Sequence, residues 1–175
     1  MDLHSAQIQG YFDIPCDHIY GSPVLIDYLE TLNLDEVVVV SPDVGGVARA
    51  RAFAKQMNDA PLAIIDKRRA AHNIAESLTV IGEVKGKTAI LIDDMIDTGG
   101  TICSGAHLLK KEGAKRIFAC TSHAVFSPPS YERLSTKDLF EQVIVTNSIP
   151  VILKEDFPQL KVLSVANMLG EAIWR

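Results

Sequence analysis

Cysteine is scarce in this sequence, and its spacing does not suit disulfide or metal chemistry. Three cysteines occur among 175 residues, at Cys16, Cys103 and Cys120, and no two of them form a Cys-x-x-Cys pair. An odd number of scattered cysteines argues against a disulfide framework, and the missing pairs argue against a zinc cluster. We therefore expect reduced thiols and a cytoplasmic location.

An excess of positive charge and long apolar runs are missing as well. The chain has 17 Lys and Arg against 22 Asp and Glu, a formal net charge of -5. Without a basic field, nucleic acid and anionic membranes are not expected partners, and any phosphate must be bound by local features. No apolar stretch reaches the ~18 residues of a membrane span, and no signal-peptide pattern opens the chain.

What the sequence does contain is an alternation of apolar β-branched runs with amphipathic segments. We expect strands at residues 37–40, 62–65, 88–92, 116–121, 142–146, 151–153 and 162–164, and helices at 47–57, 101–112 and 166–174. Strands that alternate with helices pair in parallel through right-handed crossovers. The predicted fold class is α/β, with a doubly wound, mainly parallel sheet. Residues 1–34 are less regular and form an N-terminal edge segment before an α/β domain at 35–175.

Three polar loops follow the first three predicted strands. Ligands of doubly wound sheets bind beyond the carboxyl ends of the strands, so these loops are the first place to look for a site. Their sequences are SPDVGG at 41–46, DKRR at 66–69 and DDMIDTGGT at 93–101.

The third loop combines negative charge with bare backbone. Its two glycines lead into a predicted helix, whose first N–H groups have no partner within the helix and can bind a phosphate, with the threonine hydroxyls as further donors. The paired aspartates would repel phosphate, but carboxylates accept hydrogen bonds from sugar hydroxyls and bind Mg²⁺. A lone pair of aspartates or glycines would more often be an ordinary turn. The complete stretch favours a phosphorylated sugar.

The other two loops offer weaker signals of the same kind. Gly45 and Gly46 can expose N–H groups to a pyrophosphate, and Asp43 can bind Mg²⁺, although proline, aspartate and glycine also make ordinary turns. Lys67, Arg68 and Arg69 could be a solvated basic surface. On a mobile loop at 67–73 they could instead close over a substrate and neutralise charge on a transferring phosphoryl group.

Six ordered motifs resemble those of the ribose-phosphate pyrophosphokinase family, which belongs to the phosphoribosyltransferase superfamily. They are DLHSAQIQGYF from Asp2, VVSPDVGG, IIDKRR, AILIDDMIDTGGT, CTSHAVFS at 120–127 and VTNSIP at 145–150. The resemblance implies the fold of type I phosphoribosyltransferases. It also implies transfer of the β,γ-pyrophosphoryl group of ATP, with Mg²⁺, to the 1-hydroxyl of ribose 5-phosphate, which gives phosphoribosyl pyrophosphate and AMP.

The resemblance also implies roles for individual residues. Ribose 5-phosphate would be held by Asp93, Asp94, Asp97, Thr98, Gly99, Gly100 and Thr101. His4 and Asp43 would be metal ligands that serve magnesium-ATP, with Gly45 and Gly46 at the pyrophosphate. Lys67 and Arg69 would lie on the catalytic loop and stabilise the transition state. Positioning, Mg²⁺ and cations suffice for such a transfer.

The sequence departs from the family in extent. Family members are roughly twice as long and have two related α/β domains, and this chain matches the second half with its N-terminal edge. The missing half carries segments that clasp adenine and form much of the oligomer interface. We expect a partial enzyme that keeps the ribose 5-phosphate site, binds ATP poorly alone, and associates as a homo-oligomer or with the missing half.

Two other functions are compatible with the ribose loop. A phosphoribosyltransferase would consume phosphoribosyl pyrophosphate, and a noncatalytic synthetase-associated regulatory subunit would keep the fold without catalysis. DLHSAQIQG and KRR favour the pyrophosphokinase over the transferase. The presence of Lys67, Arg69, Asp93, Asp94 and His4 argues against a noncatalytic subunit.

Overall fold

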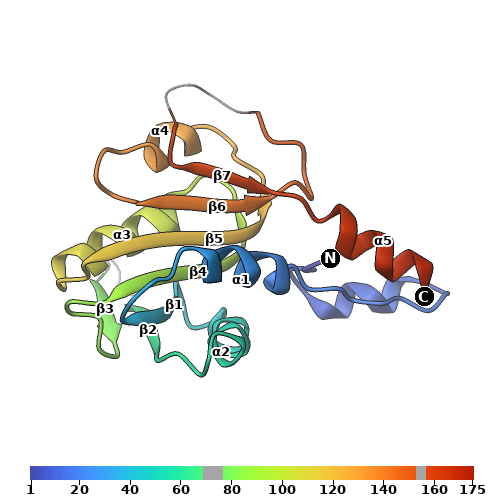
Figure 1. Cartoon of the computed structure of the whole chain (residues 1–175), viewed down its shortest axis with the longest axis horizontal. Helices are drawn as coiled ribbons and strands as arrows, with labels where there is room; N and C mark the ends of the chain where they lie inside the picture. The colour runs from blue at the N-terminus through green and yellow to red at the C-terminus, as the bar shows by residue number, and fades with distance from the viewer. Residues whose placement is uncertain (69–76, 153–156) are drawn as a thin grey trace.

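The structure, a computed structural model, describes residues 1–68, 77–152 and 157–175. Its centre is a seven-stranded sheet with the order β3-β2-β1-β4-β5-β6-β7 (Figure 1). Neighbouring strands are parallel except for β2 and β3, which are antiparallel. The strands are β1 (Val37–Ser41), β2 (Leu62–Arg68), β3 (Ser77–Ile81), β4 (Thr88–Ile96), β5 (Arg116–Ala124), β6 (Gln142–Thr146) and β7 (Leu160–Leu163). The predicted α/β fold with a mainly parallel sheet is confirmed.

Helices cover both faces of the sheet. They are the 3-10 helix η1 (Ala6–Tyr11) and the α-helices α1 (Ser22–Thr31), α2 (Val47–Gln56), α3 (Gly100–Lys111), α4 (Ser130–Leu134) and α5 (Ala166–Trp174). Buried residues of α1 and α2 pack in one core, and those of α3 pack in the other. Two cores on opposite faces are the arrangement of a doubly wound sheet.

The alternation of side chains along β4 explains why its sequence is apolar from Ala89 to Ile92. Ile90 and Ile92 belong to the core beneath α1 and α2, whereas Ala89 and Leu91 belong to the core beneath α3. Successive side chains of a strand point to opposite faces, so a strand covered on both sides needs a continuous apolar run. No helix in the described part of the chain is long and apolar enough to cross a membrane.

The structure corrects several predicted boundaries. Lys67 and Arg68 belong to β2 rather than to a loop, because β3 pairs with this end of β2. Residues 93–96 belong to β4, because β5 is long enough to pair with them. Residues 151 and 152 are not in a strand, and residue 153 lies outside the described residues, as does the rest of the predicted mobile loop from 69 onward.

Four elements were not predicted, namely η1, α1, β3 and α4. Helix α1 lies in the irregular N-terminal segment, where Leu25, Ile26 and Leu29 are buried against the sheet. Strand β3 extends the sheet beyond β2. Both ends of the chain lie at the side of the sheet toward which β6 and β7 point (Figure 1). The N-terminal segment can therefore reach the loops at the carboxyl ends of the strands.

Candidate active site

Asp93 and Asp94 lie near the carboxyl end of β4, within the strand. Asp93 is paired in register with Thr121 of β5, and Met95 is paired with His123. The Asp94 side chain is only 3% exposed, and that of Asp93 is 21% exposed. Burial of a carboxylate costs free energy unless a cation or hydrogen-bond donors accompany it. The neighbours of Asp93 and Asp94 therefore indicate the chemistry of the site.

The first neighbour is Arg49, a residue of α2 that sequence reasoning missed. Its Nη1 lies 3.2 Å from Oδ1 of Asp93 and 3.2 Å from Oδ1 of Asp94. Oδ1 of Asp93 also accepts a hydrogen bond of 2.9 Å from the backbone N–H of Asp94. The signal was present, since Arg49 follows the SPDVGG loop by three residues, but only the apolar positions of that helix entered the prediction.

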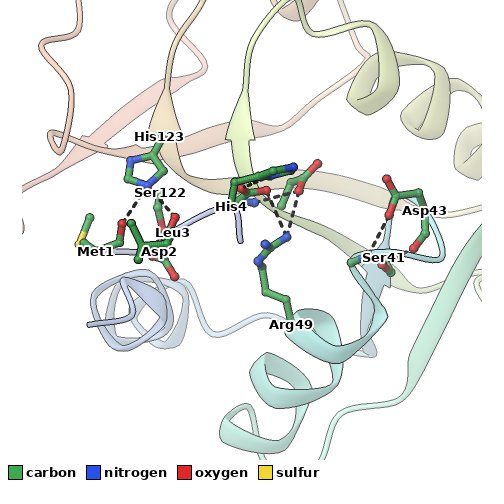
Figure 2. Close-up of polar contacts among 12 residues, drawn as sticks. Met1, Asp2, Leu3, His4, Ser41, Asp43, Arg49, Ser122 and His123 are labelled. Carbon is green, nitrogen blue, oxygen red and sulfur yellow. Dashed lines mark hydrogen bonds and ion pairs between the residues drawn. The ribbon is translucent and has the colours of Figure 1, made fainter. Parts of the chain in front are cut away.

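The second neighbour is His4, from the N-terminal segment. Nδ1 of His4 lies 2.8 Å from Oδ2 of Asp94 (Figure 2). A carboxylate only accepts hydrogen bonds, so Nδ1 carries the hydrogen and Nε2 of a neutral imidazole holds a lone pair. His4 is 72% exposed, so this nitrogen is accessible to a ligand.

The two aspartates titrate in opposite directions. Burial raises the pKa of Asp93 from 3.8 to about 7, and the side chain of Asp94 adds to the rise. Burial also disfavours the charge on Asp94, but hydrogen bonds from Asp93 and His4, with the Arg49 cation, hold the pKa of Asp94 below its ordinary value. Between pH 3.8 and about 7 the pair therefore keeps one proton on Asp93 while Asp94 is ionised.

This arrangement predicts a pH dependence of folding stability. Between pH 3.8 and about 7 the folded state holds a proton on Asp93 that the unfolded state has released, so the contribution of Asp93 to stability falls as pH rises. Asp93→Asn removes this titration. The free energy of unfolding of the wild type, measured relative to that of Asp93→Asn, should drop by roughly 4 kcal/mol from about pH 4 to about pH 8. Urea denaturation at both pH values measures it, and an equal difference at both would contradict it.

The connection from β4 to α3 has the form expected of a phosphate-binding loop. Gly99 has φ of 74°, a left-handed conformation that suits glycine, and α3 begins at Gly100. A cavity of about 150 Å³ beside this loop is lined by Asp93 and residues 95–102. Thr98 and Thr101 are exposed there. The cavity therefore brings a carboxyl group and the start of a helix to one ligand-sized space.

Arg133 supports this loop, and sequence reasoning missed it. Its Nη1 donates a hydrogen bond of 3.0 Å to the carbonyl of Thr98, although Arg133 lies 35 residues further along the chain in α4. A Cβ atom at Gly100 would lie 3.4 Å from the same nitrogen. The arginine therefore places positive charge beside the N-terminus of α3, where it favours an anion.

The SPDVGG loop closes on itself. Oδ1 of Asp43 accepts a hydrogen bond of 2.8 Å from the N–H of Gly46, and the hydroxyl of Ser41 donates to the carbonyl of Asp43 at 2.7 Å (Figure 2). In this conformation the Gly46 N–H is occupied by Asp43, whereas Gly45 is exposed. A pyrophosphate that used the Gly46 N–H would have to replace that carboxylate.

The contacts of the aspartate pair described above do not include the other residues predicted for the site. Lys67 is exposed on β2, in register with Leu78 of β3. Arg69 lies outside the described residues. Asp97 is exposed and lines the cavity at the phosphate loop. Among the residues that the structure describes, no three His, Cys, Asp or Glu side chains gather as a metal-binding group.

A larger cavity adjoins the aspartate pair on the side of α2. Its volume is about 880 Å³, and Asp93, Arg49, Gly45, Leu3 and Phe53 are among its lining residues. Asp93 therefore lines both cavities. A ligand whose sugar contacts Asp93 can extend one way to the phosphate loop and the other way toward the SPDVGG loop and the N-terminal segment.

Comparison with known proteins agrees with this geometry. The phosphoribosyl transferase domain family matches residues 24–155. A ribose-phosphate pyrophosphokinase of Prochlorococcus marinus subsp. pastoris is 93% identical over 175 residues, 100% of this chain and 53% of that protein. A ribose-phosphate pyrophosphokinase from a second strain of Prochlorococcus marinus is 84% identical, over 100% of this chain and 54% of that protein.

A solved structure shows the same relationship. The phosphoribosylpyrophosphate synthetase from Mycobacterium smegmatis has a TM-score of 0.90 at 45% identity, over 99% of this chain and 56% of that one. The expected resemblance to ribose-phosphate pyrophosphokinases is confirmed, and the chain spans about half the length of the curated relatives it matches. With a family match over residues 24–155, most of its length, the chain belongs to the phosphoribosyl transferase domain family.

Proposed function

We propose that this chain is the ribose 5-phosphate-binding part of a ribose-phosphate pyrophosphokinase. That activity transfers the β,γ-pyrophosphoryl group of ATP to the 1-hydroxyl of ribose 5-phosphate. The observation that carries the proposal is the small cavity lined by both Asp93 and the phosphate loop. Closely similar relatives with the pyrophosphokinase name support the choice of reaction.

In this proposal the two parts of the β4–α3 connection bind the two ends of one substrate. Asp93 and Asp94 accept hydrogen bonds from the ribose hydroxyls, since carboxylates are strong acceptors. The backbone N–H groups of Gly99 to Thr101, with the hydroxyls of Thr98 and Thr101, bind the 5-phosphate, and Asp97 lines the same cavity. Arg133 holds the carbonyl of Thr98 and so keeps the loop in position. The substrate is thereby oriented before any transfer, which is the main contribution required of the protein.

Lys67 and Arg69 are the proposed catalytic cations. Lys67 is exposed near the end of β2, and Arg69 follows it by two residues. Parallel strands β2, β1 and β4 are neighbours, so their carboxyl ends open on the same edge of the sheet. A lysine on this edge can offset negative charge that develops on the transferring group, as cations do in other phosphoryl transfers.

Mg²⁺ is the proposed cofactor, with His4 and Asp43 as its protein ligands. The chemistry of His4 fits this role, because a metal-binding imidazole commonly donates its other N–H to a carboxylate, as Nδ1 does to Asp94. Mg²⁺ usually takes few protein ligands and completes its shell with water and substrate phosphates, which agrees with the small number of donors. When bound, Mg²⁺ would neutralise phosphate charge, and the protein would orient the substrates around it.

Pairing with a second copy or with the remainder of a longer protein is also proposed. Exposed apolar side chains occur on the N-terminal segment and on α5. Within these two segments the largest exposures are those of Tyr11, Ile14, Ile173 and Trp174. Apolar groups of this size at the surface favour association.

Calorimetric titration of the 175-residue chain tests the binding function. We expect ribose 5-phosphate to bind about tenfold or more tightly than ribose or inorganic phosphate, since only the phosphorylated sugar engages both parts of the cavity. Equal affinities for the three compounds would contradict the proposal. Incubation with Mg-ATP and ribose 5-phosphate, or with phosphoribosyl pyrophosphate and a base, separates pyrophosphokinase from transferase activity by product analysis.

A further inference from the structure

Two motifs at the ends of β5 and β6 have no part in the small cavity at the β4–α3 connection, although Ser122 lines the larger one. They are CTSHAVFS at 120–127 and VTNSIP at 145–150. Their polar side chains, Ser122, His123, Thr146 and Ser148, are buried or half-buried. Buried polar groups require partners, and here the partners belong to the first residues of the chain and to the two strand ends themselves.

Asp2 is the first point of attachment. Its side chain is buried, and Oδ2 accepts hydrogen bonds from the hydroxyl of Ser122 and, at 2.7 Å, from the N–H of Gly21. A Cβ atom at position 21 would lie 2.8 Å from Oγ of Ser122 and 2.9 Å from Oδ2 of Asp2, so only glycine permits this approach. Asp2 has φ of 38°, a strained value that surrounding contacts must maintain.

His123 is the second point of attachment. Its Nε2 lies 3.2 Å from the carbonyl oxygen of Met1 and 3.0 Å from that of Asp2 (Figure 2). Nδ1 of the same ring lies 2.8 Å from Oγ of Ser148, whose hydroxyl donates to the carbonyl of Ser122 at 2.8 Å. The imidazole thus links the backbone at the start of the chain to the ends of β5 and β6.

These attachments end two residues before His4. The N–H of Leu3 donates to Nε2 of His18 at 2.9 Å, which fixes the backbone immediately before His4. The His4 side chain itself is 72% exposed and contacts Asp94 by one hydrogen bond. One such bond to an exposed side chain does not offset the entropy lost by ordering a free segment. The contacts of residues 1–3 therefore help to hold His4 in place.

We propose that Asp2 and His123 are positioning residues, which act through residues 1–3 to hold Nδ1 of His4 against Asp94. Held in this way, Nε2 of His4 is directed away from Asp94 and toward the ligand. Neither residue lines the small cavity at the β4–α3 connection, whereas Asp2 lines the larger cavity and His123 does not. The inference rests on the proposed function only for the identity of the ligand that binds His4. The positioning of His4 by Asp2 and His123 does not depend on it.

Nitrogen-15 NMR of the histidine side chains in the 175-residue chain tests the attachment directly. At about pH 8.5, where a neutral imidazole is the major form, we expect wild-type His4 to carry its hydrogen on Nδ1. His123→Asn keeps a group near Ser148 but cannot reach the carbonyls of Met1 and Asp2, so His4 should shift to the Nε2–H form. His123→Gln can still donate to those carbonyls and should restore the Nδ1–H form.

A second matched pair of variants tests the role of Asp2. Asp2→Ala should release His4 in the same way, whereas Asp2→Asn keeps an acceptor oxygen for Gly21 and Ser122 and should retain the wild-type tautomer. Thermal unfolding of each variant shows whether the domain is intact. A His4 signal that is unchanged in folded His123→Asn and Asp2→Ala would overturn the proposal, and so would equal changes in both members of each pair.

A kinetic readout separates positioning from general damage. In the full-length Prochlorococcus marinus relative carrying this sequence in place of its matching segment, His123→Asn should raise the KM for Mg-ATP about tenfold, with little change in the KM for ribose 5-phosphate. An equal rise in both constants would contradict the proposal. If the full-length protein carrying the unsubstituted sequence were inactive, the proposed function would be refuted. The NMR experiment would still show whether Asp2 and His123 position His4.

Discussion

Replacing Lys67 with alanine is expected to reduce turnover about 10²–10³-fold while the KM for ribose 5-phosphate changes little. A cation that stabilises charge only in the transition state contributes to the rate and not to substrate binding. Lys67 is exposed on β2, outside the two cavities that Asp93 lines, so its loss should leave the ribose site intact. The measurement is steady-state kinetics in the full-length Prochlorococcus marinus relative with this sequence in place of its matching segment.

Two further variants sharpen this experiment. Lys67→Arg keeps the positive charge and should therefore recover part of the turnover lost in Lys67→Ala. Recovery should be incomplete because the guanidinium is broader than an ammonium group and its charge lies at a different position. Lys111→Ala removes an exposed lysine at the last residue of α3 and should leave turnover unchanged. Unchanged turnover in Lys67→Ala would remove Lys67 from the catalytic group and favour a noncatalytic, ribose 5-phosphate-binding role for this chain.

Asp94→Asn is expected to weaken ribose 5-phosphate binding by roughly 10- to 100-fold, which corresponds to about 1.5–3 kcal/mol for a hydrogen bond to a charged group. Asparagine preserves the size of the side chain but removes a carboxylate that is 3% exposed and accompanied by Arg49 and His4. The substituted amide has one acceptor oxygen and a donor group in a place arranged for acceptors only. Calorimetric titration with ribose 5-phosphate measures the loss.

The control for this variant is Asp59→Asn. Asp59 is an exposed residue in the turn between α2 and β2, at the amino end of that strand. Its φ of 52° is a conformation that asparagine also adopts, so the change removes one negative charge and leaves the backbone as it is. Equal affinities for Asp94→Asn and Asp59→Asn would show that the aspartate pair does not hold the sugar.

The glycine turn between β4 and α3 was predictable because it depends on adjacent residues. Gly99, Gly100 and the start of α3 are adjacent in sequence, and a left-handed glycine before a helix is a property of a few residues. The alternation of strands and helices was predictable for the same reason. It follows from the periodicity of apolar residues within single segments.

The extent of β4 and β2 was less predictable. Asp93 and Asp94 are polar, and strand propensity ends where the apolar run ends at Ile92. They are nevertheless in β4 because β5 continues beside them and supplies hydrogen-bond partners. Lys67 is in β2 because of its register with Leu78 of β3. A strand boundary of this kind depends on the neighbouring strand, which the segment's own residues do not specify.

The sequence by itself determined the fold class and the family of this protein, and it predicted a glycine-containing turn before α3. Only the tertiary structure decided how the aspartate pair is supported. Arg49 reaches Asp93 across 44 residues, His4 reaches Asp94 across 90, and His123 reaches the backbone of Asp2 across 121. Local sequence specifies the conformation of short segments, but the partner of a buried charge depends on which distant segments the packed sheet brings to the same edge.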